Sequence, residues 1–222
     1  MTIDYHSHCL PGIDDGAKTP DEGVELLKTL KSQGVDTVCL TPHFYASMKV
    51  DDFLRRRDAA LEKLLAAAGG AELPKLVLGA EIHISYGLSE VKNLDKLTYE
   101  GTERMLLELP YEKFSHVFCD EIESLIAKYE IKPVMAHVER YTSWYDWPYG
   151  FLEKFDYYGT VYQFNVTSLE PFLLRRKIKS LLDEGLPAVF GSDTHSVKSR
   201  PPRFDLFVKH LGKYEIKNIF EK

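Results

Sequence analysis

Histidine and carboxylate side chains recur along this chain at the points where short apolar runs end. His6 and His8 end the first run, His43 follows the second, and Glu81 follows the third. The later runs end in the same way at Glu108, His137, Asp193 and His195. Imidazole and carboxylate groups together suit Zn, Mn or Fe, and no paired-cysteine motif indicates a structural zinc site. These residue types therefore predict a site for divalent metal ions.

The spacing of these residues favours ligands that share a metal. His6 and His8 form an HxH pair, and residues two apart in a strand point to the same face. Asp193 and His195 form a DxH pair of the same kind. Glu81 is a candidate bridge, because one carboxylate can donate an oxygen to each of two cations.

Each residue also has a structural interpretation when it is taken alone. A lone histidine such as His43 is more often a hydrogen-bonded structural residue than a ligand. Glu108 lies in the apolar run MLLEL and must be paired, protonated or bound to a cation. Asp14 and Asp15 in DDG could simply form a turn. Clustered without cations, however, these carboxylates and imidazoles would be costly to bury, and this favours the metal site.

The segments between these residues predict the fold that positions them. We expect strands over 2–8, 36–40, 76–80, 105–109, 132–137, 161–166 and 187–190, and helices over 20–33, 50–68, 117–128, 171–184 and 204–211. Thr19 is the expected N-cap of the first helix, with Pro20 at its first position and Gly34 as its stop. Alternating strands and helices predict an α/β fold with a parallel sheet, here an incomplete or distorted barrel. The carboxyl ends of such strands converge on one functional face.

Composition and charge limit the partners and the cellular location that we expect for the protein. A formal charge of -6 argues against general binding of nucleic acid. Three cysteines do not make a disulfide framework, so we expect a reducing, cytoplasmic location. The first residues, MTIDYHSH, have no signal-peptide pattern, and no apolar run approaches the roughly 20 residues needed to cross a bilayer. We expect one domain over residues 1–222 and no membrane insertion, and the oligomeric state stays open.

Six motifs, taken in order, resemble the polymerase and histidinol phosphatase (PHP) superfamily: DYHSH, DDG, TPHF, GAEIH, AHVER and GSDTHS. Within it, HSHCLPGIDDGAKTPDEG followed by GVDTVCLTPHF is similar to the bacterial tyrosine-protein phosphatases of capsular and exopolysaccharide synthesis. The match extends from Asp4 to about Pro202. The resemblance implies a distorted (β/α)7 barrel of the PHP type with three divalent metal ions, most often Mn²⁺, with Fe or Zn as alternatives.

The resemblance also implies roles for individual residues. One metal would be held by His6, His8, Glu81 and Asp193, a second by Glu81, Glu108 and His137, and a third by Asp15, His43 and His195. Asp15 is preferred to Asp14 because it directly precedes glycine. Arg140 of HVER and Arg200 of SVKSRPP match positions that bind phosphate, although surface salt bridges are the ordinary role of arginine. With Asp193 and His195 they make up the expected catalytic set.

These roles suggest a phosphatase mechanism as a hypothesis. The metals would lower the pKa of a bound water, and the resulting bridging hydroxide would attack phosphorus. Arg140 and Arg200 would stabilise the charge on the phosphate oxygens. No arginine stands six residues after any of the three cysteines, which excludes the cysteine-dependent phosphatase mechanism. The implied substrate is a phosphotyrosine protein, in particular a tyrosine kinase of polysaccharide assembly.

Three other interpretations stay open at this point. The chain could be a PHP phosphatase for a small phosphoester such as histidinol phosphate, or a non-catalytic regulatory module that binds metal. It could also be a barrel whose polar strand ends serve stability alone.

The aromatic stretch Tyr141–Tyr149 could line the pocket or simply cover the barrel, and the Arg55–Arg57 run is interpreted as a solvated helix face. His83 is interpreted either as reaching the site or as supporting a ligand.

Overall fold

Parallel strands form two sheets in the computed structural model, which describes residues 1–112, 115–141 and 158–221. The smaller sheet has the order β1 (Ile3–Ser7), β2 (Thr37–Leu40), β4 (Lys75–Leu78). The larger sheet has the order β3 (His43–Phe44), β5 (Glu81–His83), β6 (Arg104–Glu108), β7 (Lys132–Met135), β8 (Val161–Asn165), β9 (Ala188–Gly191). Every pair within the sheets is parallel, which confirms the predicted α/β class.

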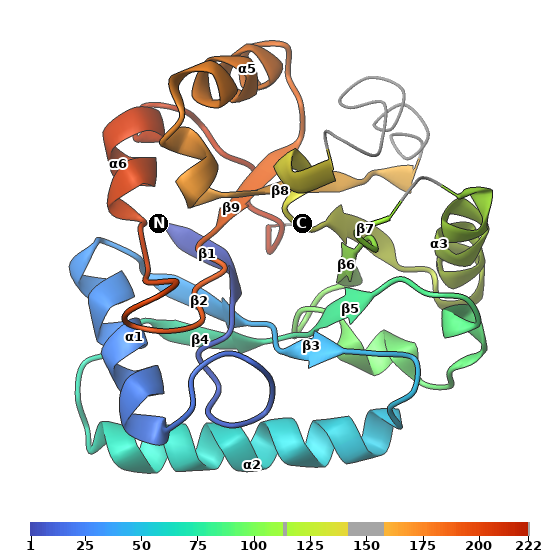
Figure 1. Cartoon of the computed structure of the whole chain (residues 1–222), viewed down its shortest axis with the longest axis horizontal. Helices are drawn as coiled ribbons and strands as arrows, with labels where there is room; N and C mark the ends of the chain where they lie inside the picture. The colour runs from blue at the N-terminus through green and yellow to red at the C-terminus, as the bar shows by residue number, and fades with distance from the viewer. Residues whose placement is uncertain (113–114, 142–157, 222) are drawn as a thin grey trace.

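Backbone hydrogen bonds connect the two sheets into a distorted barrel. At one junction the chain passes from β2 to β3 and from β4 to β5, and the Gly79 amide donates to the Leu40 carbonyl and the Glu81 amide to the Pro42 carbonyl, each at 3.0 Å. At the other, the Asp193 amide donates to the His6 carbonyl at 2.7 Å and the His8 amide to the Thr194 carbonyl at 3.0 Å. Figure 1 shows the strands around a common centre, with helices on the outside.

The seven predicted strands are all present, and the structure adds two short strands, β3 and β5, that the sequence did not predict. The chain breaks between β2 and β3 and again between β4 and β5. Pro42 lies in the first break and has no amide hydrogen for a strand ladder. In the second break, a side chain at Gly79 would lie 3.2 Å from the Tyr99 ring and 3.3 Å from the Thr41 methyl group. The breaks distort the barrel next to His43 and Glu81.

The helices agree with the sequence to within one residue at each end. They are α1 (Pro20–Ser32), α2 (Val50–Ala68), α3 (His116–Tyr129), α5 (Phe172–Asp183) and α6 (Asp205–Leu211). Thr19 caps α1 as expected, because its hydroxyl accepts from the Glu22 amide at 3.2 Å. Arg57 on α2 departs from the predicted solvated face. It is buried and donates to the Gly79 carbonyl at 3.1 Å.

The inner faces of the strands change from apolar to polar along their length. On β8, Val161 belongs to a small apolar cluster with Ile3, Leu106 and Val189, whereas Gln163 and Asn165 on the same face are polar and buried. The opposite faces pack under the helices, where the Phe190 ring lies 5.3 Å from the Phe207 ring of α6. Since all the strands run the same way, the polar positions collect at one end of the barrel.

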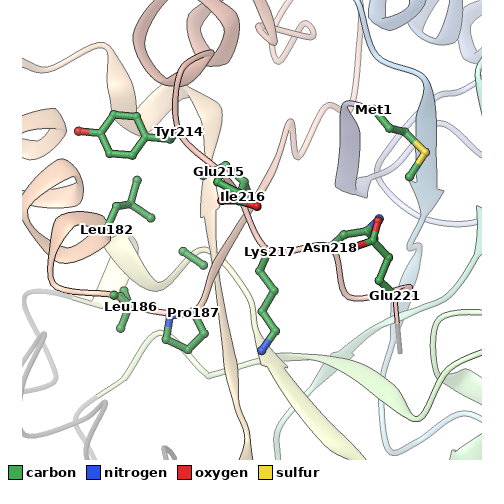
Figure 2. A pocket seen from close by; sticks show the side chains of 12 residues that line it. Met1, Leu182, Leu186, Pro187, Tyr214, Glu215, Ile216, Lys217, Asn218 and Glu221 are labelled. Carbon is green, nitrogen blue, oxygen red and sulfur yellow. The ribbon is translucent and has the colours of Figure 1, made fainter.

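The amino ends of β1 and β9 border a pocket of about 650 Å³ (Figure 2). Met1 and Pro187 line it where these strands begin, and Tyr214, Lys217 and Glu221 line it from the last part of the chain. Among the described residues, we found no helix with the length and apolarity needed to span a membrane.

Candidate metal centre

The carboxyl ends of the strands bring all nine predicted metal ligands together. They form four overlapping groups, and within each group the possible ligand atoms lie within 4.8 Å of one another. The groups are His8, Asp15, His43 and His195; His6, His8 and Asp193; His6, Glu81 and His137; and His43, Glu81 and Glu108. Eight of the nine follow a strand end or lie in a strand, and Asp15 comes from the loop between β1 and α1.

Glu81 lies at the centre of this cluster and is 1 % exposed. Its Oε2 lies 3.1 Å from His6 Nε2 and 3.0 Å from His43 Nδ1, while its Oε1 lies 2.9 Å from His137 Nε2. Burial opposes the charge of this carboxylate. The charge of His6 and the contacts with His137 and His43 outweigh it and hold the Glu81 pKa well below its usual range. One carboxylate thus faces several imidazoles through both of its oxygens.

The contacts around Glu81 can be compared with the three sets that the resemblance implies, although the structure also pairs Glu81 with His43 at 3.0 Å. In the first, the Nε2 atoms of His6 and His8 lie 3.1 Å apart, and Asp193 Oδ1 lies 3.7 and 3.5 Å from them. In the second, His137 Nε2 lies 3.4 Å from Glu108 Oε1.

The third set settles where each of the neighbouring aspartates lies. Asp15 Oδ1 is 3.3 Å from His43 Nε2 and 3.4 Å from His195 Nε2. The Asp14 carboxylate lies 2.8 Å from His8 Nδ1 and accepts from the His43 amide at 3.1 Å. Asp15 therefore faces the cluster, and Asp14 supports two of its members. This geometry favours the choice of Asp15 that was made from the DDG pattern.

Ring tautomers provide a test of whether the cluster fits metal ions. Gln163 Oε1 accepts from the His137 amide at 2.7 Å, so it is an oxygen and His6 Nδ1 must donate to it. His8 Nδ1 donates to Asp14 in the same way. The Nε2 atoms of both rings therefore face each other, 3.1 Å apart and beside Glu81. Two imidazole nitrogens oriented in this way by the contacts of their Nδ1 atoms fit metal ions.

Further buried atoms in the cluster are without a hydrogen-bond partner among the described residues. They include His43 Nδ1, Glu81 Oε2 and His195 Nε2. The opposite nitrogen of His195, Nδ1, donates to the Asp193 carbonyl at 3.0 Å, which leaves Nε2 as the bare nitrogen facing Asp15. Buried polar atoms are rarely left unpaired, so their convergence supports a site for positive ions.

The electrostatics of the cluster also favour positive charge. Burial disfavours protonation of His8, but its bonds to Asp14 and Glu81 outweigh burial and raise its pKa to about 10. His137 is raised to a pKa of about 9 against the same effect of burial, by Glu108 and Glu81. The carboxylates that attract protons to these rings would attract divalent cations, for which the protons compete.

Two arginines border the cluster on its exposed side. Arg140 and Arg200 both donate through Nη2 to Asp193 Oδ2, the latter at 2.7 Å. Their side chains are 33 % and 40 % exposed, so each has donors left that face solvent. Arg140 also donates to the Tyr111 hydroxyl at 3.2 Å. The structure thus places both predicted phosphate-binding residues beside the cluster, in ion pairs with one of its members.

Several residues of the site were missed or left open by sequence reasoning. Gln163 and Asn165 are hydrogen-bonded to cluster members, and their signal was two polar residues of the same face in the apolar run VYQFNV. His83 Nδ1 lies 3.2 Å from Glu108 Oε2 and thus supports a cluster member. From the aromatic stretch, Tyr141 is buried with its hydroxyl 3.2 Å from His137 Nδ1, and the remainder of that stretch lies outside the described residues.

Two cluster members have an unusual backbone. His137 has a φ of 30° and Asp193 a φ of 51°, in the left-handed region that favours glycine. They follow β7 and β9, where the chain turns out of the barrel. Such strain persists where surrounding contacts enforce it, and it is common at functional sites.

Comparison with known proteins agrees with this geometry. The tyrosine-protein phosphatase CpsB of Streptococcus pneumoniae is 28 % identical over 98 % of this chain and 94 % of its own length. The tyrosine-protein phosphatase YwqE of Bacillus subtilis is 30 % identical, covering 89 % of this chain and 79 % of its own.

The fold and the family are also matched. A crystal structure from a study of YwqE and CpsB, described there as unique metal-dependent tyrosine phosphatases, has a TM-score of 0.74 at 21 % identity and covers 98 % of this chain and 89 % of that one. A sequence model of the family described as capsular polysaccharide synthesis, CpsB/CapC, matches residues 2–222. These findings confirm the resemblance seen in the motifs, and the chain belongs to the CpsB/CapC family.

Proposed function

We propose that this protein is a metal-dependent protein-tyrosine phosphatase. The observation that carries the proposal is the buried Glu81 carboxylate, which faces imidazoles through both oxygens. Two arginines stand at the open side of the same cluster. The buried anionic donors suit cations, and the partly exposed guanidinium groups beside them suit a phosphate dianion that enters from the solvent side. The related CpsB and YwqE carry the name of the same activity.

The proposed ligands are the three sets whose contacts are described above, with Glu81 shared between the first and the second. Divalent cations, with Mn²⁺ as the proposed resident metal, supply Lewis-acid stabilisation and lower the pKa of water. The imidazole and carboxylate donors would also hold Fe or Zn.

The remaining residues bind and orient the substrate in this proposal. Arg140 and Arg200 keep one contact each to Asp193 and direct other N–H groups to the phosphate oxygens. Tyr45 and Tyr111 are partly exposed, with rings 5.8 Å from His43 and 6.3 Å from His137. Aromatic walls beside the cluster suit an aryl phosphate.

The setting of the activity is part of the proposal. Residues 1–222 act as one domain in the cytoplasm. The substrate is a phosphotyrosine protein, and a tyrosine kinase of polysaccharide assembly is the proposed partner.

Phosphate release from a phosphotyrosine peptide with Mn²⁺ tests the function. We expect activity to fall by at least about 100-fold after EDTA treatment and in His137→Ala, because a ligand matters more than its supporting residues. His210→Ala, on α6 away from the cluster, should keep full activity. Phosphoserine peptide and histidinol phosphate serve as competing substrates. Faster cleavage of histidinol phosphate would support the small-phosphoester alternative, and no cleavage of any phosphoester would support a regulatory module.

A further inference from the structure

Strand β8 contributes none of the nine proposed ligands, yet it holds a buried polar pair beneath them. Gln163 is 0 % exposed and Asn165 is 2 % exposed. Gln163 Nε2 donates to Asn165 Oδ1 at 3.0 Å, so the two amides form one continuous chain. Neither amide is among the proposed ligands, and burying them without partners would be costly. Their place in the fold therefore calls for another role.

Within this pair of amides, Gln163 determines which nitrogen of His6 faces the cluster. Gln163 Oε1 accepts from the His137 amide at 2.7 Å and lies 3.1 Å from His6 Nδ1. Because the His137 amide can only donate, the orientation of the Gln163 amide is determined. His6 Nδ1 then carries a hydrogen directed at Gln163, which leaves Nε2 as the nitrogen that faces Glu81 and His8.

The second amide of the pair, Asn165, holds Asp193. Asn165 Oδ1 is occupied by Gln163, so its Nδ2 is directed to Asp193 Oδ2 at 2.9 Å. Oδ2 also receives Arg140 and Arg200, while Oδ1 faces His6 and His8. Asn165 thus helps to keep one oxygen of Asp193 occupied and the other directed at the histidines.

The backbone leaves room for this arrangement at Gly191. A Cβ there would lie 2.5 Å from His6 Cβ and 3.0 Å from Gln163 Nε2. Any larger residue would have to displace the His6 backbone or break the amide chain. The close approach of β1, β8 and β9 at this point brings His6, Gln163 and Asp193 into one hydrogen-bonded unit.

We propose that Gln163 and Asn165 are positioning residues that select the metal-binding nitrogen of His6 and orient the carboxylate of Asp193. The inference rests on the proposed metal centre. Residues that orient ligands in this way contribute about 10- to 100-fold to metal affinity or activity. Gln163→Met keeps the size of the side chain and removes both its acceptor and its donor. Asn165→Ala removes the contact with Asp193 and the acceptor for Gln163 Nε2, and it leaves Gln163 Oε1 between the His137 amide and His6 Nδ1.

The test measures Mn²⁺ affinity by competition with a chelator, and the protonation of the His6 ring by ¹⁵N NMR of the full chain after metal removal. We expect Gln163→Met to lose about 10- to 100-fold in Mn²⁺ affinity and to show a mixture of His6 tautomers. Asn165→Ala should lose less affinity, since two arginines still hold Asp193, and should keep the hydrogen on Nδ1. In Gln163→Met, added Mn²⁺ should restore kcat.

Ser168→Ala is the matched control, because Ser168 is buried and donates at 2.6 Å to the backbone carbonyl of Asn165. Its Mn²⁺ affinity should equal that of the wild type. The inference is overturned if Gln163→Met binds Mn²⁺ within twofold of the wild type, if its His6 ring keeps only Nδ1–H, or if Ser168→Ala loses affinity equally. If Gln163→Met loses Mn²⁺ affinity but the wild-type protein cleaves no phosphotyrosine, this inference stands and the proposed function is rejected.

Discussion

The two ends of the barrel differ more than their shared strands suggest. The carboxyl ends hold nine clustered histidines and carboxylates, of which seven are buried. The amino ends border the pocket of about 650 Å³ in Figure 2, whose lining includes Lys217 and Glu221 but no histidine among the described residues. Among the described residues, this pocket and the ionisable cluster therefore lie at opposite ends of the strands. Clustered buried ionisable groups are themselves an indication of a functional site.

The direction of the strands explains this difference. On the inner face of β6, Leu106 is apolar and Glu108 is acidic, and β8 follows the same order from Val161 to Asn165. Because β6 and β8 run in the same direction, the polar positions of both strands lie at the same end of the barrel. The amino end is left with apolar interior packing and the last residues of the chain.

Substitution at Glu81 should give the largest contrast between the ends. Glu81→Gln keeps the shape but removes the charge shared by several imidazoles. We expect phosphatase activity to fall by more than about 100-fold and bound metal to decrease, measured by peptide turnover and elemental analysis. Glu221→Gln at the amino end is the control and should match the wild type. Full metal content in Glu81→Gln would contradict a central role for this carboxylate.

The arginines should show the next largest effect. Arg140→Lys and Arg200→Lys keep the charge but lose the fork that suits phosphate, and kcat/KM should fall by about 10- to 100-fold. Arg140 should matter more, because it is less exposed and is held by Tyr111. Arg203→Lys, which alters an ion pair with Glu170 at 3.1 Å, provides the comparison. Equal kinetics in all three variants would indicate that the cluster arginines serve the fold alone.

Metal binding should depend on pH in a defined direction. The pKa values of about 10 for His8 and about 9 for His137 mean that both rings are protonated at pH 7 in the metal-free protein. A metal needs the unprotonated ring, so binding releases protons and affinity rises with pH, by about tenfold per unit for each proton released. Calorimetry in two buffers of different ionisation enthalpy counts these protons. A heat that is the same in both buffers would contradict proton release.

The smallest effect is expected at the amino end. Lys217→Met removes the charge that lines the pocket, while the carbonyl of Lys217 can still accept from the Tyr5 hydroxyl. Activity should be unchanged and the free energy of unfolding should move by no more than about 0.5 kcal/mol. Denaturant unfolding and peptide turnover measure both. A loss of turnover above threefold would show that the two ends are coupled.

Local signals allowed much of this molecule to be predicted. The Thr19 cap and the glycine after α1 act within a few residues of the helix they bound, which is why its ends were accurate. The sequence predicted that the ligands lie together, because alternating strands and helices indicate parallel strands whose carboxyl ends meet on one face. The break at Gly79 was missed because it depends on Tyr99 and Arg57, which are distant in sequence. Gln163 was missed because the search for ligands considered charged and imidazole side chains, and an amide in an apolar strand is neither.

The two adjacent aspartates show the same limit within a single turn. Asp14 and Asp15 have the same side chain and neighbouring positions, so local pattern alone hardly separates them. Their surroundings differ through contacts made by other strands. Asp14 binds His8 and the His43 backbone, and Asp15 faces His43 and His195. The DDG pattern suggested Asp15, and the contacts of the folded chain give the role of each aspartate.

The left-handed backbone at His137 and Asp193 has a consequence for anyone who selects sturdier versions of this protein. Glycine at either position would relieve strain on the order of 1 kcal/mol. It would also remove a donor from the centre. A search guided by heat resistance alone would therefore be drawn to these two positions, and the variants it enriched would survive heating while losing their chemistry.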